Sequence, residues 1–244
     1  MAAQSPTGEV AAPTTDAGTE TRGSRFRRAW RRGWGFPGGE PHSHTRGDDS
    51  LLELTQDWRR NISFREAGLT PLFDEERDHV RGSAEASVTL VEYGDYESAS
   101  CRAAAKAVGT VRERHGASLR FVFRHFPVGD AHPLALHAAQ AAEAAGAQGQ
   151  FWEMHDAMYE GDLRLEPRML LDLADRLGLD VERFESELAD ESHLSHVLDD
   201  FGSGVRSGVN GIPTFFVDGD RFEWDHQPAS LDRALVSAGV RRPA

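Results

Sequence analysis

Ser98 and Cys101, three residues apart, are the two side chains of this 244-residue chain whose types and spacing fit sulfur chemistry. A cysteine reacts as its thiolate, and the start of a helix stabilises a thiolate through unpaired N–H groups and the positive end of the helix dipole. A serine at the start of a helix can donate a hydrogen bond to a thiolate, or it can cap the helix. The pair therefore predicts either thiol chemistry or a capped helix start.

The elements around this pair must place it between a strand and a helix. The run from Val88 to Tyr93 reads V-T-L-V-E-Y, which is typical of a strand buried on both faces. Gly94 and Asp95 end this run. The sequence after Arg102 is rich in helix-forming residues, with apolar positions at helical spacing. We therefore expect residues 97–101 at a strand-to-helix junction.

The strand, the G-D-Y-E turn after it and a cysteine at a helix start resemble the active-site segment of the DsbA-type thiol-disulfide oxidoreductases, a branch of the thioredoxin superfamily. A second motif supports the resemblance, because residues 210–217 read N-G-I-P-T-F-F-V, the form of that superfamily's cis-proline loop. The resemblance implies an α/β, thioredoxin-like fold with an inserted all-helical subdomain. It also implies a cis bond before Pro213 and a binding site for a peptide or a thiol at Ile212, Pro213 and Thr214.

The chain departs from the DsbA motif at one of its two cysteines. The family carries Cys-x-x-Cys, whereas this chain has Ser98 at the position of the attacking cysteine and Cys101 at the position of the resolving one. Cys101 is the only cysteine in the chain, so no intramolecular disulfide can form. We therefore predict a protein of DsbA ancestry that has lost the dithiol cycle and keeps a groove for a peptide or a thiol.

Other interpretations of these residues stay open. The alternative function is a thiol transferase or monothiol oxidoreductase that uses Ser98 or Cys101 with an external low-molecular-weight thiol. A mixed disulfide at Cys101 requires that its side chain is exposed. Ser98 is otherwise a helix cap that remains after the loss of catalysis. Glu92 is either a buried acid that tunes the nearby thiol or a residue at an exposed strand end.

The histidines raise the question of a metal site. Three of them, His125, His132 and His137, lie within 13 positions, and His193 and His196 are three apart. No H-E-x-x-H motif and no cysteine/histidine cluster accompanies them in the sequence. We therefore expect surface histidines, and neither a metal nor another cofactor.

The composition argues against several classes of protein. The formal net charge of −13 argues against broad nucleic-acid binding. No apolar run approaches the roughly 20 residues that cross a bilayer. The first residues, M-A-A-Q-S-P-T-G-E-V, carry no recognisable secretory signal. These features predict a cytoplasmic location, and the resemblance implies a peptide or protein thiol, or a low-molecular-weight thiol, as the partner.

The chain divides into three predicted regions. Residues 1–49 are expected to be disordered, 50–80 to form a partly helical lead-in, and 81–244 to form the DsbA-like thioredoxin domain with a helical insert at about 131–208. The charged stretch 74–82, D-E-E-R-D-H-V-R-G, and the strand after it are similar to thioredoxin-like domains fused to bacterial sodium/proton antiporters. The expected strands are 88–93, 119–126, 214–217 and 221–224, and the helices of the insert are 134–147, 151–159, 167–177, 180–188 and 194–205.

An arginine-rich and aromatic segment lies inside the first region. Phe26, Trp30 and Trp34 are spaced by four residues and would share one face of a helix. This pattern fits a peripheral contact with an anionic membrane or with an acidic partner, and the other interpretation is a solvated tail whose glycines prevent a stable helix. The residues for a membrane contact are Arg25, Arg27, Arg28, Trp30, Arg31, Arg32 and Trp34.

Overall fold

The structure is a computed structural model, and it describes residues 68–129, 131–160 and 165–240. The arginine-rich and aromatic segment and most of the predicted lead-in lie outside these residues. No helix within the described ranges combines the length and the apolar character that a membrane crossing requires.

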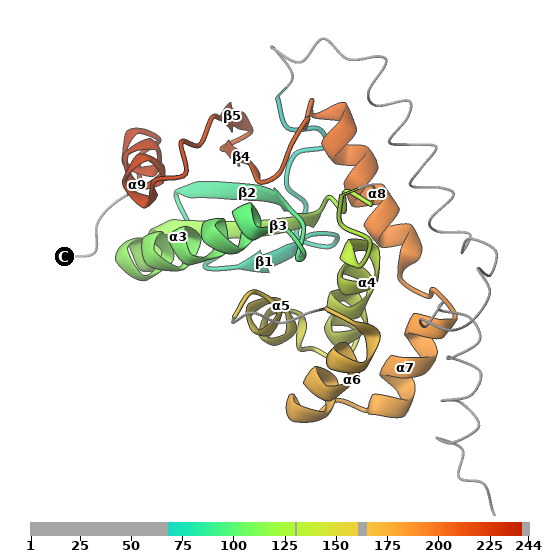
Figure 1. Cartoon of the computed structure of the whole chain (residues 1–244). Coiled ribbons are helices and arrows are strands. Elements are labelled where there is room, and N and C mark those ends of the chain that lie inside the picture. Colours follow the sequence, from blue (N-terminus) through green and yellow to red (C-terminus); the bar gives the residue numbers. More distant parts are fainter. Residues whose placement is uncertain (1–67, 130, 161–164, 241–244) are drawn as a thin grey trace, which may run out of the picture. The chain divides into compact units, whose positions relative to one another are not determined.

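A five-stranded mixed sheet forms the centre of the described part of the chain, with the strand order β1-β3-β2-β4-β5. Strands β2 and β3 pair in parallel and are joined by helix α3, while the other neighbouring strands pair antiparallel. Helix α9 packs beside α3 (Figure 1). The strands are β1 (His79–Arg81), β2 (Val88–Gly94), β3 (Leu119–His125), β4 (Thr214–Val217) and β5 (Asp220–Phe222). The helices are α3 (Ala99–His115), α4 (Ala135–Gly146), α5 (Phe151–Tyr159), α6 (Pro167–Arg176), α7 (Val181–Ala189), α8 (Leu194–Arg206) and α9 (Pro228–Ser237).

Each face of the sheet buries an apolar core, because successive strand residues point to opposite faces. On one face, Leu90 and Phe121 belong to a core that also contains side chains of α3, α4, α5 and α9. On the other face, Val91 and Val122 pack in a second core with side chains of α4 and α8. Burial on both faces explains why β2 reads as a nearly continuous apolar run.

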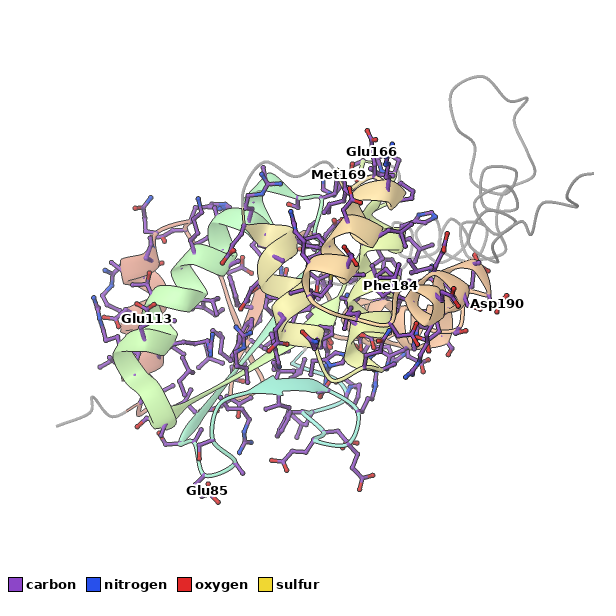
Figure 2. The ribbon with its side chains drawn as sticks, turned by 90° about the horizontal axis from the view of Figure 1, so that it is seen from below. Glu85, Glu113, Glu166, Met169, Phe184 and Asp190 are labelled. Carbon is purple, nitrogen blue, oxygen red and sulfur yellow. The ribbon has the colours of Figure 1, made fainter. Side chains whose placement is uncertain are left out.

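Between β3 and β4 the described residues form five helices, α4 to α8, which is where the helical insert was predicted. Helix α4 is rich in alanine and almost wholly buried, so its neighbours can approach it closely. Figure 2 shows Phe184 of α7 within the insert, whereas Glu166 and Asp190 lie at its rim. Phe184 has no exposed surface. The predicted thioredoxin-like fold with a helical insert is confirmed.

The structure contains an edge strand, β1, that the sequence did not predict. His79, Val80 and Arg81 pair antiparallel with Phe123, Val122 and Phe121 of β3. These three residues belong to the stretch that was interpreted as a charged lead-in. Three residues are too few for a period-2 pattern to emerge from the surrounding charges, so only the pairing with β3 reveals the strand.

A buried ion pair fixes the chain before β1 to the sheet. The guanidinium of Arg124, at the end of β3, donates to both carboxylate oxygens of Asp78 at 2.8 Å. It also donates to the Tyr93 hydroxyl at 2.9 Å. The Arg124 and Asp78 side chains are 0% and 1% exposed, so both charges are shielded from bulk solvent. This pair attaches Asp78 and the residues around it to the centre of the sheet.

Candidate functional site

Ser98 caps the helix that follows β2. Its backbone is extended, and its side-chain oxygen accepts a hydrogen bond from the backbone N–H of Cys101 at 3.3 Å. The helix begins at Ala99, earlier than its run of helix-forming residues indicated, because this cap satisfies an N–H group of the first turn. Ser98 is 5% exposed. The hydroxyl therefore faces the protein and performs the structural role that the sequence left open.

Cys101 lies in the first turn of α3 and has no exposed surface. Burial raises the pKa of its thiol well above the ordinary value, and the nearby Glu92 carboxylate adds to the rise. A hydrogen bond with the Ser98 side chain works in the opposite direction and is outweighed. At neutral pH Cys101 is therefore a protonated thiol, and the exposure that a mixed disulfide requires is missing.

Glu92 is a buried acid, which decides between the two interpretations of the sequence. It is 1% exposed in the middle of β2, and its Oε1 atom has no hydrogen-bond partner among the described residues. Burial raises its pKa from the ordinary 4.5 to about 8. Glu92 therefore stays protonated at neutral pH.

The burial of Glu92 predicts that the protein loses stability as the pH rises. Between pH 4.5 and about 8 the unfolded chain loses the Glu92 proton while the folded chain keeps it. The folded state then binds more protons, so the free energy of unfolding falls by up to about 1.4 kcal/mol per pH unit. The substitution Glu92→Gln keeps the shape of the side chain and removes its titratable carboxyl group. Urea unfolding across this window should give a shallower pH slope for Glu92→Gln, and an identical slope in both proteins would contradict the assignment.

Hydrogen bonds to Asp95 hold the turn between β2 and α3. Its Oδ1 atom accepts from the backbone N–H of Glu97 at 2.8 Å, and its Oδ2 atom accepts from Val128 N–H at 3.0 Å. The ring Nδ1 atom of His132 lies 2.7 Å from the same Oδ2, and this hydrogen bond raises the pKa of His132. The sequence identified Asp95 only as a residue that ends a strand, and its role depends on a loop more than 30 residues away.

The loop before β4 lies at the same end of the sheet as Ser98. The Ile212–Pro213 peptide bond is cis, and Thr214 is paired with Tyr93 across β4 and β2. Because these two strands are antiparallel, the residues before Thr214 lie beside those after Tyr93. Ile212 and Pro213 are half-buried, and the Thr214 hydroxyl donates to the Gly211 carbonyl at 2.7 Å. The two motifs found in the sequence therefore lie at the same end of the sheet.

A family model described as thioredoxin matches residues 74–236 of this chain, which is more than half of its length. The chain therefore belongs to the thioredoxin family. The oxidised form of BdbD from Bacillus subtilis superposes with a TM-score of 0.64 at 20% identity, over 71% of this chain and 98% of BdbD. A thioredoxin-like oxidoreductase from Silicibacter pomeroyi gives a TM-score of 0.62 at 27% identity, over 68% of this chain and 95% of that protein.

Curated relatives of this chain carry the name Na(+)/H(+) antiporter NhaA. NhaA 1 from Salinispora arenicola is 46% identical over 165 residues, which make up 68% of this chain and 25% of that relative. NhaA from Herminiimonas arsenicoxydans is 38% identical over 183 residues, or 75% of this chain and 29% of the relative. This chain thus spans less than a third of the length of these two curated relatives. The predicted similarity to a part of antiporter-named proteins is confirmed.

The prediction of surface histidines is wrong for His125, which is 1% exposed. This residue ends β3 where α4 covers the sheet, and its Nε2 atom lies 2.7 Å from Glu143 of that helix. The hydrogen bond offsets the cost of burying the ring. His132, His193 and His196 are half-buried and also face carboxylates.

Proposed function

We propose that this chain is a DsbA-type thioredoxin-fold protein that binds a peptide or a thiol ligand and does not run a dithiol redox cycle. The observation that carries the proposal is the burial of Cys101, the chain's one cysteine, with no exposed surface. A dithiol cycle needs a second cysteine that attacks the substrate, and Ser98 occupies that position as a helix cap. The S-x-x-C motif thus keeps the strand-to-helix geometry of the DsbA-type site and lacks its attacking thiol.

The ligand would bind at the loop of Ile212, Pro213 and Thr214. Asn210 and Gly211, which precede the loop, are exposed, and Arg221 holds them in place by donating to the Gly208 carbonyl at 2.6 Å and to the Asn210 side chain at 2.9 Å. An extended peptide that pairs with the Ile212 backbone would join the sheet as an added strand, with main-chain hydrogen bonds for affinity.

The test of lost redox activity is the thiol-dependent reduction of insulin. We expect the wild-type protein to give no rate above the background of the small-molecule reductant alone, because it has no exposed thiol. A dithiol thioredoxin measured at the same concentration is the positive control. A clear wild-type rate would refute the proposal and favour the alternative of a thiol transferase or monothiol oxidoreductase. That alternative is weaker here, because Ser98 and Cys101 are 5% and 0% exposed.

The arginine-rich and aromatic segment at residues 25–34, outside the described residues, is proposed to contact anionic lipid. Each arginine near such a surface contributes about 1 kcal/mol, and salt screens this attraction. We expect the full chain to sediment with vesicles of anionic lipid at low salt and to be released at high salt. Deletion of residues 1–46 should abolish binding and leave the melting temperature unchanged. Equal binding of the truncated and full chains would assign the interaction to another surface.

A further inference from the structure

Three side chains that commonly bind metals meet on the insert side of the sheet, outside the Ser98–Cys101 site. His79 lies on the edge strand β1, Glu143 on α4 and His196 on α8. One ligand atom from each of these residues lies within 4.8 Å of the others. The sequence predicted no metal site, because residues from three distant elements show no spacing motif.

The distances between the ligand atoms are close to those of a metal centre. The Nε2 atom of His79 lies 2.7 Å from Glu143 Oε1, and the Nε2 atom of His196 lies 3.7 Å from the same oxygen. In a tetrahedral zinc site with metal–ligand bonds of about 2.0–2.2 Å, neighbouring ligand atoms are about 3.3–3.6 Å apart. The two observed distances lie on either side of this range. Small side-chain rotations would therefore admit an ion.

The Nε2 atom of His196 faces two carboxylates across a gap. It lies 3.7 Å from Glu143 Oε1 and 3.8 Å from Asp200 Oδ2, and both distances exceed the roughly 3.2 Å limit of an N–H···O hydrogen bond. The nearby Arg77 guanidinium is paired with the other Asp200 oxygen at 3.2 Å. The gap beside His196 is therefore bordered by negative charge, and a bound cation would link the imidazole to the carboxylate.

Neighbouring groups orient the three candidate ligands. The Nε2 atom of His125 lies 2.7 Å from Glu143 Oε1, so that ring can donate to the carboxylate and fix its direction. The His79 ring stacks on Phe151 with 3.4 Å between the ring centroids. Hydrogen bonds to ligating carboxylates, such as the one that His125 can make to Glu143, orient the ligands around metal ions in proteins.

Solvent reaches the two histidines of the group more than the glutamate. The side chains of His79 and His196 are 21% and 28% exposed, whereas that of Glu143 is 8% exposed. A cavity lined in part by Asp78, Gly146 and Phe151 borders His79. An ion could therefore enter from solvent and keep water as its remaining ligand.

We propose that His79, Glu143 and His196 bind a divalent transition-metal ion, with Zn²⁺ as the reference ion. Two imidazoles and one carboxylate suit zinc, and they leave a fourth position for water. The ion would connect β1 with α4 and α8, so that binding would fasten the helical insert to the edge of the sheet. A ligand that binds only the folded state raises its stability.

The test is a calorimetric titration of the full chain with Zn²⁺, using protein produced without a histidine tag, together with melting curves with and without the ion. We expect one equivalent to bind and the melting temperature to rise. Glu143→Gln and His196→Ala should each weaken zinc binding at least about tenfold and remove the rise in melting temperature. Co²⁺ should give a visible absorption spectrum with the wild type that His196→Ala alters.

His193→Ala is the matched control, because His193 lies three residues before His196 and pairs with Glu187 at 2.9 Å. It should bind zinc as the wild type does. The His196 Nε2 atom forms no hydrogen bond with the facing carboxylates, so His196→Ala breaks none there. A melting curve of this variant without metal shows whether it is folded. Equal zinc binding by the wild type and His196→Ala would assign the ion to other histidines and overturn the site, and so would a wild type with no zinc-dependent rise in melting temperature.

Discussion

Ser98→Cys is expected to convert the chain from a protein with one inert thiol into one with an oxidisable dithiol. The Ser98 side-chain oxygen accepts from the backbone N–H of Cys101 at 3.3 Å, so the two residues share the first turn of α3 and an introduced sulfur would lie within reach of the existing one. The helix start would also stabilise the new thiolate. After mild oxidation, thiol titration under denaturing conditions should fall from two groups per chain to none. When an added reductant returns this disulfide to the dithiol, the variant should reduce the disulfides of insulin and become oxidised in turn.

Ser100→Cys is the control for this experiment, because it adds a thiol to the same turn. Residues 100 and 101 are adjacent, with Cα atoms about 3.8 Å apart, which is shorter than the roughly 4.4–6.8 Å of ordinary disulfides. Its two thiols should therefore remain titratable. If the thiols of Ser98→Cys also remain free, the alignment of Ser98 with the lost nucleophile is wrong. If the disulfide forms but the variant does not reduce insulin, the chain has kept the geometry of the DsbA-type site without its catalytic activity.

Arg124→Met is expected to cause a large loss of stability. The methionine is apolar, so the Asp78 carboxylate would remain buried without its ionic partner. Breaking a buried pair in this way costs about 3–5 kcal/mol. For a domain of this size the melting temperature should fall by about 6–20 °C. Thermal unfolding followed by circular dichroism gives the measurement.

Arg183→Met provides the comparison for a pair exposed to solvent. Arg183 lies 2.6 Å from Glu187 on α7, and its side chain is 48% exposed, so water and salt screen the attraction. Its loss should cost less than about 0.5 kcal/mol. The double variant Asp78→Asn/Arg124→Met should be less destabilised than Arg124→Met, because it no longer buries an unpaired carboxylate at position 78. Equal melting temperatures for Arg124→Met and Arg183→Met would show that the buried pair contributes no special stability.

The sequence predicted the parts of this fold that local pattern encodes. The apolar run of β2 follows from neighbouring residues. The Ser98 cap was one of two interpretations that the sequence left open, and the resemblance to the DsbA-type proteins implied the cis bond before Pro213. The sequence could not decide whether Glu92 was buried, because an acid in a strand fits both a strand end and a core, and only the helices packed on β2 settle the question. The strand β1 and the meeting of His79 with Glu143 also depend on residues distant in the chain, so no periodicity or spacing revealed them.

Both edges of the five-stranded sheet in the described residues are formed by strands of only three residues, β1 and β5. A long edge strand presents a row of unpaired N–H and C=O groups on which another chain can polymerise, and short edge strands are one way in which proteins avoid this. Neither edge of this sheet offers more than a few main-chain hydrogen bonds to an incoming strand. The short edge strands therefore protect the sheet against edge-to-edge aggregation.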